Sequence, residues 1–540
     1  MLSTMQDSQL SIAQLLRYGS TFHADQEVVT WTESGARRRS YAEVGRRCAA
    51  LAHALRTLGV TGDQRVATFM WNNAEHLEAY LAVPSMGAVV HPLNIRLFPD
   101  QLVHIANHAE DHVVIVDQSL LSLLVPQLPH LRSVKHLVIT GPNVDDVDVP
   151  AGIEVHSYED LLASSPTEFD WPEIDERAAA AMCYTSGTTG DPKGVAYSHR
   201  SIYLHSMTVC TTAGPALKQG DRALAVVPQF HVMAWGLPYA AFMTGASLIM
   251  PDRFLQPEPL AELIAAERPT FAAAVPTVWL GLHRHLQRHP QDVSHIDEVI
   301  VGGSAVPASL MHTFADDHGI GMLQLWGMTE TSPLGSVARP PADAEGEERW
   351  RYRYTQGRFA PLVEARLIGP DGAVVPNDGE SIGELEVRGP WVTGEYYGVD
   401  APEKFHDGWL RTGDVGSISR DGFLTLTDRA KDVIKSGGEW ISSVDLENAV
   451  MAHPAVIEAA VIGVPDPKWD ERPLVAVVLD ENADVSVATL HTFLTDRVAK
   501  WQLPENWAIV DDVPKTSVGK FDKKRLRSQF HDGDLTVTRI

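Results

Sequence analysis

Apolar and polar positions alternate along most of the chain with two periods, one typical of strands and one typical of helices. Ser40 and Glu43 have the spacing of a helix capping box, apolar residues follow on one helical face, and Gly59 marks the end of that helix. The stretches 65–71 and 112–117 are apolar runs of strand length. Such strands and helices recur to about residue 330, which predicts βαβ units, parallel sheets and an α/β fold.

The pattern changes after residue 330. Two hairpins are predicted around Asp371-Gly372 and Asp421-Gly422, because each dipeptide separates two strand-like runs. Further strands are expected near 455–463 and 474–479, within a compact α+β unit. The predicted organisation is a large multi-sheet α/β N-terminal domain over 1–428, a hinge over 429–431 and a small α+β C-terminal domain over 432–540.

The stretch from Val232 to Met250 carries no charge over 19 residues, which is long enough for a membrane span. It is interrupted by Gly236, Pro238 and Gly245, however, and a short strand-like run ends it. We therefore predict a buried helix, a break at Gly245 and a strand, and no transmembrane segment.

Composition narrows the class of protein. A chain of 540 residues is too long for one core, and 44% apolar with 21% charged residues is a normal globular balance. A net charge of −26 without a basic run argues against a nucleic-acid partner. Cys48, Cys183 and Cys210 show neither metal nor disulfide spacing, and the N-terminus lacks the pattern of a signal peptide, so a cytoplasmic location is expected.

The stretch YTSGTTGDPKGVAYSH, residues 184–199, is the first candidate for chemistry. It directly follows an apolar run, and a glycine-rich turn after a buried strand is how proteins present backbone N–H groups to a phosphate. The spacing is not that of the P-loop G-x-x-x-x-G-K-S/T, so another kind of phosphate site is predicted. The alternative is a solvated surface loop.

Five further stretches follow in order: VGGSAVP, LQLWGMTET, GWLRTGDVG, TDRAKDVIKSGGEWIS and PKTSVGKFDKKRLR. With the first, they resemble the adenylate-forming superfamily of acyl-CoA synthetases, luciferases and peptide-synthetase adenylation domains, and the resemblance covers essentially the whole chain. FHVMAWGLPYAAFMTGA and DRAKDVIKSGGEWISSVDLEN look most like bacterial medium- and long-chain fatty-acyl-CoA synthetases. Each motif alone is weak evidence, whereas six in order are strong.

The resemblance implies that the glycine-rich loop wraps the β- and γ-phosphates of ATP, with hydroxyl and backbone donors and one lysine. The residues so assigned are Thr185, Ser186, Gly187, Thr188, Thr189, Gly190 and Lys193. Glu330 is implied as the Mg²⁺ ligand, because a carboxylate beside a triphosphate repels it unless a cation lies between them. The resemblance implies Thr185 as the second metal contact, and Thr329 would hydrogen-bond the α-phosphate.

The adenosine site is implied around Trp326, whose indole would stack on adenine, although plain core packing is the alternative. The surrounding contacts are assigned to Gly303, Ser304, Ala305, Gln324 and Gly327. Asp414 resembles the ribose ligand, since a carboxylate accepts from both hydroxyls, and Arg429 would share that ribose. The family usually has glycine before this arginine. Here it is Asp428, which would either stiffen the domain junction or only cap a turn.

The family's C-terminal domain is mobile and rotates between two half-reactions, so the resemblance implies a hinge at Lys431. Lys520 would serve adenylate formation and Lys435 thioester formation; a solvated surface role is the alternative for any single lysine. The coenzyme A path is assigned to Lys435, Ser436, Gly437 and Gly438, and Lys431 and Trp440 to the nucleotide. The acyl pocket is assigned to His231, Val232 and Trp235, with the tryptophan as a gate, although a well-packed helix would show the same residues.

The prediction is an ATP- and Mg²⁺-dependent ligase that joins a carboxylic acid, most simply a fatty acid, to coenzyme A through an acyl-adenylate. One alternative is an adenylating enzyme with another acceptor, such as an amine in an amide ligase or a nitrite-using diazotase. A non-catalytic nucleotide-binding protein is a third possibility, but it predicts the loss of Glu330 or Lys520, and both are present. The acyl chain length stays open, and so does the homodimer that the long N-terminal region would allow.

Overall fold

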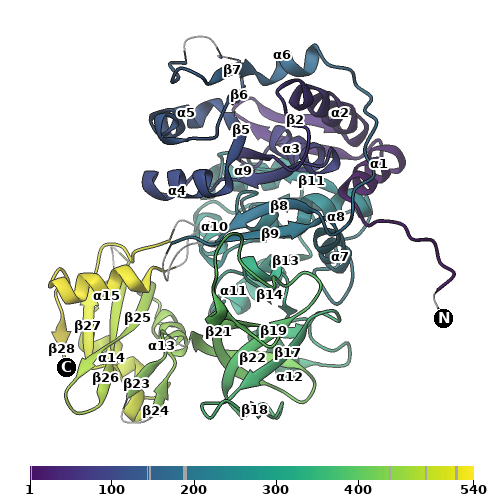
Figure 1. Ribbon diagram of the computed structural model, residues 1–540. Coiled ribbons are helices and arrows are strands. Elements are labelled where there is room, and N and C mark those ends of the chain that lie inside the picture. The colour runs from purple at the N-terminus through teal and green to yellow at the C-terminus, as the bar shows by residue number, and fades with distance from the viewer. Residues whose placement is uncertain are drawn as a thin grey trace.

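The computed structural model describes the chain except residues 2, 143, 145–146, 186–190, 430, 437–438, 481–482, 484 and 517–520, and except the side chains of 439 and 440. Figure 1 shows a larger body that contains two sheets, with a smaller unit at the side of its lower part. We call the two sheets upper and lower, although the lower sheet also reaches into the upper part of the view. The smaller unit is the C-terminal end of the chain, coloured yellow-green to yellow.

The upper sheet has the strand order β7-β6-β5-β3-β4-β8-β9. Its strands are parallel except for the β8–β9 pair, which is an antiparallel hairpin. Its strands are β3 (Arg65–Phe69), β4 (Val89–Pro92), β5 (Asp111–Asp117), β6 (His136–Thr140), β7 (Glu154–Ser157), β8 (Ala179–Tyr184) and β9 (Gly194–Ser198). The predicted strands at 65–71 and 112–117 are therefore confirmed.

The lower sheet is parallel from β14 through β13, β12, β10 and β11 to β1, and antiparallel beyond β14, where the predicted hairpins lie. Its first part contains β1 (Glu27–Thr32), β2 (Gly35–Ser40), β10 (Arg222–Ala225), β11 (Ser247–Met250), β12 (Phe271–Ala274), β13 (Glu298–Val301) and β14 (Gly321–Trp326). Its second part contains β15 (Ser336–Val337), β16 (Gly357–Phe359), β17 (Glu364–Ile368), β18 (Val374–Val375), β19 (Gly383–Arg388), β20 (Phe405–His406), β21 (Trp409–Ile418) and β22 (Phe423–Arg429).

One large cluster of buried apolar residues takes side chains from both sheets and from α1, α2, α3 and α8, and so joins the two parts into one body. The helices of this body are α1 (Ile12–Phe22), α2 (Tyr41–Thr57), α3 (Ala74–Ser85), α4 (Pro99–Ala109), α5 (Leu121–Leu124), α6 (Tyr158–Ala163), α7 (His199–Val209), α8 (Leu237–Thr244), α9 (Pro257–Glu267), α10 (Pro276–Arg288), α11 (Ala308–His318) and α12 (Gly346–Tyr354). The predicted cap of α2 is confirmed, because the Ser40 hydroxyl accepts a hydrogen bond from the Glu43 N–H at 3.1 Å.

The uncharged stretch from Val232 contains the predicted helix, the break at Gly245 and the strand, but the helix begins later than the pattern suggested. Val232 to Gly236 all have positive φ and form a left-handed turn, η3. The helix α8 starts only at Leu237, just before Pro238, whose fixed φ and missing N–H suit a first turn. Within the described residues, no helix is both long and apolar enough to cross a membrane.

The C-terminal unit has its own sheet and its own apolar clusters. Its strands are β23 (Ile434–Ser436), β24 (Glu439–Ile441), β25 (Val456–Asp466), β26 (Asp470–Leu479), β27 (Asn506–Ile509) and β28 (Thr538–Arg539), and its helices are α13 (Ser443–Met451), α14 (Val487–Leu494) and α15 (Lys523–Asp532). The last strand of the lower sheet ends at Arg429, so the chain passes between the two units near the predicted hinge. The domain limits at 428 and 432 stay a prediction.

Candidate functional site

A cavity of about 280 Å³ lies between the lower sheet and the C-terminal unit. Its walls come from the segments that follow the carboxyl ends of β12, β13 and β14, from the end of β22, and from α13 and the start of α15. Ligands of open parallel sheets bind at this end of the strands. The predicted residues that line the cavity are Gly303, Ser304, Ala305, Gln324, Trp326, Gly327, Asp414, Arg429 and Lys431.

Trp326, Asp414 and Arg429 form a connected chain at the wall of this cavity. The indole Nε1–H of Trp326 donates to Oδ2 of Asp414 at 2.8 Å, and Nε of Arg429 lies 3.2 Å from Oδ1 of the same carboxylate. The Asp414 charge raises the pKa of Arg429. Trp326 also belongs to a buried apolar cluster, and it packs against Gly335 so closely that a Cβ there would lie 2.3 Å from its ring. Its indole is thus both packed in the core and held beside an anionic group.

The side-chain amide of Gln324 connects two segments of the cavity wall. Its Oε1 accepts from the Val306 N–H and its Nε2 donates to the Thr355 carbonyl, both at 2.7 Å. The amide therefore ties the loop after β13 to the segment before β16, in addition to lining the space.

A second group of predicted residues meets at the base of the glycine-rich loop. The Thr185 hydroxyl accepts from the Lys193 N–H at 3.0 Å, and the two backbones pair, which closes the loop. The Lys193 ammonium lies 4.8 Å from the ring centre of Tyr396, and the Tyr396 hydroxyl donates to Oε1 of Glu330 at 2.6 Å. Burial and the Glu330 charge raise the pKa of Tyr396, so this hydroxyl keeps its proton. Lysine, tyrosine and glutamate thus form one polar cluster.

Sequence reasoning missed two tyrosines that support this cluster. Tyr396 orients Glu330, and the Tyr197 hydroxyl donates to the Thr329 carbonyl at 2.7 Å. Tyr396 lies outside the motifs, Tyr197 lies near the end of the glycine-rich stretch without an assigned role, and each is far along the chain from its partner. Only the folded chain reveals them.

Other predicted residues fall outside the described set or away from the cavity. Ser186, Gly187, Thr188, Thr189, Gly190, Gly437, Gly438, Lys520 and the side chain of Trp440 lie outside the described residues. Thr516 and Phe521, which flank the segment of Lys520, line the cavity. Lys435 is exposed and Ser436 is bonded to Arg472 at 3.0 Å, and neither is a lining residue.

Asp428, at the end of β22, connects the two units. Its Oδ2 accepts from both the backbone N–H (2.7 Å) and the hydroxyl of Ser443, the first residue of α13. Beside it, the Ser442 hydroxyl donates to the Thr427 carbonyl, and Lys523 bonds to Ser443 and to Glu447 (2.8 Å). Of the two explanations for aspartate at this position, the structure favours stiffening of the junction, because the carboxylate is buried and bonded across it.

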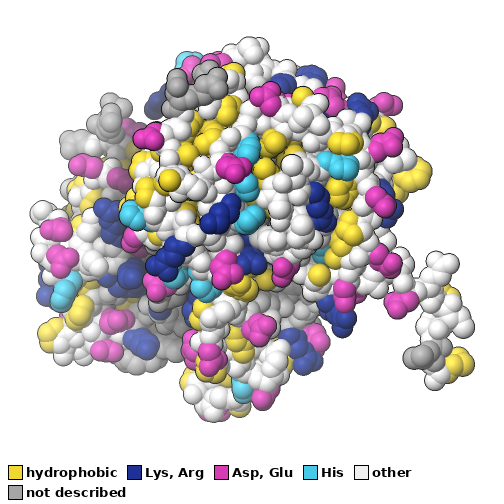
Figure 2. All heavy atoms as spheres, turned by 45° about the horizontal axis from the view of Figure 1, so that its top comes forward, with side chains coloured by type: hydrophobic (Ala, Val, Ile, Leu, Met, Phe, Trp, Pro, Cys, Tyr) yellow, Lys and Arg dark blue, Asp and Glu magenta, His cyan; other side chains and the backbone are white. Residues whose placement is uncertain are grey.

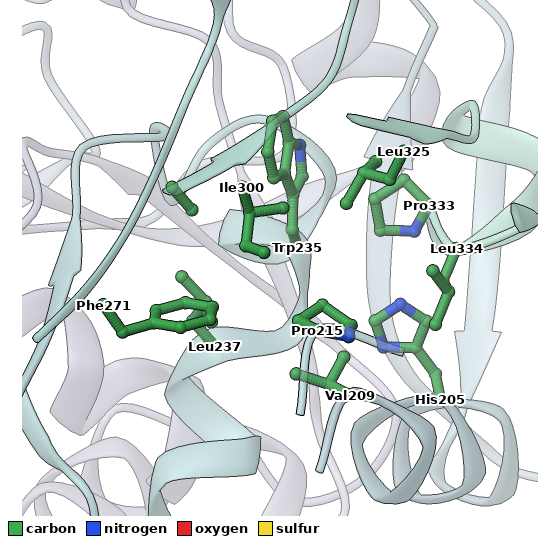
Figure 3. Close-up of a pocket in the computed structure, with 11 residues that line it drawn as sticks. His205, Val209, Pro215, Trp235, Leu237, Phe271, Ile300, Leu325, Pro333 and Leu334 are labelled. Carbon is green, nitrogen blue, oxygen red and sulfur yellow. The ribbon is translucent and has the colours of Figure 1, made fainter. Parts of the chain in front are cut away.

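The segment assigned to the acyl pocket contributes one of its three residues to a small apolar pocket. Trp235 lines a small apolar pocket of about 10 Å³, which Figure 3 shows together with His205, Leu237, Phe271, Ile300 and Leu325. His231 and Val232 do not line it. A Cβ on Gly302 would lie 3.2 Å from the Trp235 ring, so this indole packs against the start of the loop after β13.

Two features of this pocket lower the stability of the folded state. The left-handed backbone at Val232–Trp235 costs about 1–2 kcal/mol per residue, and such strained conformations concentrate at functional sites. Burial also lowers the pKa of His205 to about 3, so its imidazole is neutral, and its Nε2 has no hydrogen-bond partner among the described residues. Figure 3 shows this ring beside Leu334 in the wall of the pocket.

Two family models match the chain. The model described as AMP-binding enzyme matches residues 18–397, and the one described as AMP-binding enzyme C-terminal domain matches 445–520. A 3-methylmercaptopropionyl-CoA ligase of Ruegeria lacuscaerulensis is 42% identical, covering 98% of this chain and 99% of the relative. A medium-chain fatty acid–CoA ligase of Ectopseudomonas oleovorans is 42% identical (98% and 98%), and a long-chain fatty acid–CoA ligase of Thermus thermophilus is 43% identical (98% and 97%).

Solved structures agree with the fold over nearly the whole chain. ATP-bound MatB from Rhodopseudomonas palustris aligns with a TM-score of 0.81 at 26% identity, over 97% of this chain and 99% of that one. The amide bond synthetase McbA from Marinactinospora thermotolerans gives 0.80 at 25% identity, over 96% and 100%. An anthranilate CoA ligase in complex with anthranoyl-AMP gives 0.88 at 23% identity, over 99% and 100%, a likeness of fold. The expectation of a large α/β body with a smaller C-terminal domain is confirmed.

Proposed function

The chain belongs to the AMP-binding enzyme family, and on that basis we propose that it is an ATP-dependent ligase that joins a carboxylic acid to coenzyme A through an acyl-adenylate. The observation that carries the proposal is the wall of the 280 Å³ cavity, where an indole, a carboxylate and a guanidinium converge beside backbone from the loop after β13. These groups suit an adenine ring, a ribose and a phosphate in turn. The relatives at 42–43% identity favour coenzyme A as the acceptor.

The first half-reaction forms the mixed anhydride. The carboxylate of the acid attacks the α-phosphorus of ATP, and pyrophosphate leaves with the electrons of the broken P–O bond. Lys193 faces the polar cluster, and Glu330 would hold Mg²⁺, for which a buried carboxylate beside the base of a phosphate loop is a suitable ligand. Mg²⁺ would supply neutralising charge to the triphosphate. Tyr396 donates a hydrogen bond to Oε1 of Glu330 and so orients the carboxylate that would hold the metal.

The second half-reaction transfers the acyl group. The thiolate of coenzyme A attacks the acyl carbon, and AMP leaves. We propose that the segment 517–520 acts in the first step, because its neighbours Thr516 and Phe521 line the cavity. Lys435 and Ser436 do not line it, so their proposed role in the second step requires rotation of the C-terminal unit about the hinge near Lys431.

The acyl chain would enter beside Trp235. The pocket there is lined by apolar side chains, which suits an aliphatic or aromatic acid, but about 10 Å³ has no room for a chain. Trp235 would therefore have to move when the acid binds. Its strained left-handed backbone would favour such a change to a second conformation.

We also propose a cytoplasmic location, since the three cysteines are free and buried or half-buried.

Pyrophosphate release over a panel of acids and amines, each with and without coenzyme A, tests the proposed function. Turnover of fatty acids that requires coenzyme A is the expected result. Turnover that requires an amine and does not depend on coenzyme A would show that the acyl acceptor is an amine. Binding of ATP without release of pyrophosphate for any acid would leave only a nucleotide-binding protein and would refute the proposal.

A further inference from the structure

Three side chains that can bind a metal meet in the upper sheet, away from the nucleotide cavity. His136 is the first residue of β6, and Glu154 and His156 lie on the neighbouring strand β7. In the register of the two strands His136 is opposite Glu154, and Val138 is opposite His156, so all three side chains point to the same face of the sheet. Figure 2 brings this end of the molecule forward and shows histidine side chains beside acidic ones on its surface.

The separations among the three groups match a metal site. Nδ1 of His136 lies 3.1 Å from Nε2 of His156. One oxygen of Glu154 lies 3.6 Å from the first nitrogen and 3.8 Å from the second. Zinc–ligand bonds of about 2.0–2.2 Å in tetrahedral geometry place ligand atoms roughly 3.3–3.6 Å apart, so an ion fits among these three with minor adjustment.

A hydrogen bond between two neutral imidazoles is the competing explanation for the short nitrogen–nitrogen distance. The chain contains a natural comparison, because His283 and His318 make a ring-nitrogen contact of the same 3.1 Å. Within the described parts of the chain, however, only the group at His136 has a carboxylate within ligand distance of both rings. At 3.6 and 3.8 Å that carboxylate is too far to accept a hydrogen bond from either ring, but it is well placed to share an ion with them.

The surroundings suit a divalent ion that solvent can reach. The side chains of His136 and His156 are 15% and 19% exposed, whereas Glu154 is 71% exposed. The two rings are thus held by the sheet, and the open side leaves a position for water.

We propose that His136, Glu154 and His156 bind one divalent ion of the zinc class, with water as the fourth ligand. Two imidazoles and one carboxylate favour zinc, nickel or copper over Mg²⁺, which prefers oxygen ligands, so this site is chemically distinct from the proposed magnesium site at Glu330. Because β7 is the edge strand of the upper sheet, the ion would fasten that edge to β6.

The test uses the full-length protein after removal of metals with a chelator, titrated with Zn²⁺ in a calorimeter and with Co²⁺ in a visible spectrometer, with Mg²⁺ present throughout. We expect about one Zn²⁺ per chain and a tetrahedral Co²⁺ spectrum. Glu154→Gln should weaken binding at least about tenfold without affecting the fold, since this side chain is largely exposed. His156→Gln should abolish both signals, and Zn²⁺ should raise the Tm of the wild-type protein but not the Tm of His156→Gln.

His318→Gln is the matched control, because it breaks the other close histidine pair and should leave Zn²⁺ binding unchanged. Circular dichroism of each variant excludes unfolding as the cause of a loss. Wild-type binding no stronger than that of His156→Gln would overturn the proposal. Equal losses in His318→Gln, or full affinity in Glu154→Gln, would also overturn it, because binding would then not depend on these three ligands.

Discussion

Replacing Asp428 with glycine should change how the two units of this protein are held together. The Asp428 carboxylate accepts two hydrogen bonds across the junction, from the N–H and the hydroxyl of Ser443. Bonds to a charged group contribute about 1.5–3 kcal/mol each, so removing both should destabilise this arrangement by at least about 3 kcal/mol. That corresponds to a shift of roughly a hundredfold in the equilibrium between this arrangement and any rotated one.

The expected consequence is opposite in the two half-reactions. The arrangement that Asp428 stabilises places Thr516 and Phe521 at the cavity, which we assign to adenylate formation. Asp428→Gly should therefore slow pyrophosphate release, by roughly a hundredfold, and should leave the transfer from a supplied acyl-adenylate to coenzyme A unchanged or faster. Rapid-quench measurement of each half-reaction separates the two effects, and limited proteolysis of the junction gives an independent readout.

Two controls separate domain position from damage to the site. Ser443→Ala removes one of the two donors, so it should show the same direction of change with a smaller size. The affinity for ATP should fall little in either variant, because Trp326 and Asp414 are bonded to each other and not to Asp428. If Asp428→Gly changes both half-reactions by the same factor, or neither, the aspartate does not control the domain arrangement.

Three further predictions concern the proposed site. Glu330→Gln keeps size and hydrogen bonding but removes the charge for Mg²⁺, so adenylation should fall by orders of magnitude with an unchanged Tm; a collapse of the Tm would make the residue structural. Trp235→Ala should widen the range of acids in a chain-length assay, whereas a loss of about 3–5 kcal/mol in denaturant unfolding with unaltered preference would mean core packing. The Lys520→Ala variant should lose adenylate formation but still transfer the acyl group of a supplied acyl-adenylate to coenzyme A. The Gly437→Leu variant should form the adenylate but lose this transfer. Equal losses in both steps for both variants would argue for one fixed active site.

Much of the fold was predictable because its signals are local. The cap of α2 at Ser40, the hairpin turn at Asp421-Gly422 and the alternation of strands and helices depend on residues a few positions apart. The left-handed turn at Val232–Gly236 was not predictable, since its apolar sequence is equally typical of a helix, and the contacts of Trp235 with Gly302 and of Gly236 with His205 join residues far apart in the chain.

The sequence by itself determined the order of the motifs, and with it the family and the identity of Trp326, Glu330, Asp414 and Arg429 as site candidates. Only the tertiary structure brought Tyr396 to Glu330, joined Asp428 to Ser443 and gathered His136, Glu154 and His156 at one edge of a sheet. The physical reason is the range of the interactions. Caps, turns and periodic burial are fixed by neighbours along the chain, whereas these contacts join residues that are close only because separate strands and helices pack together.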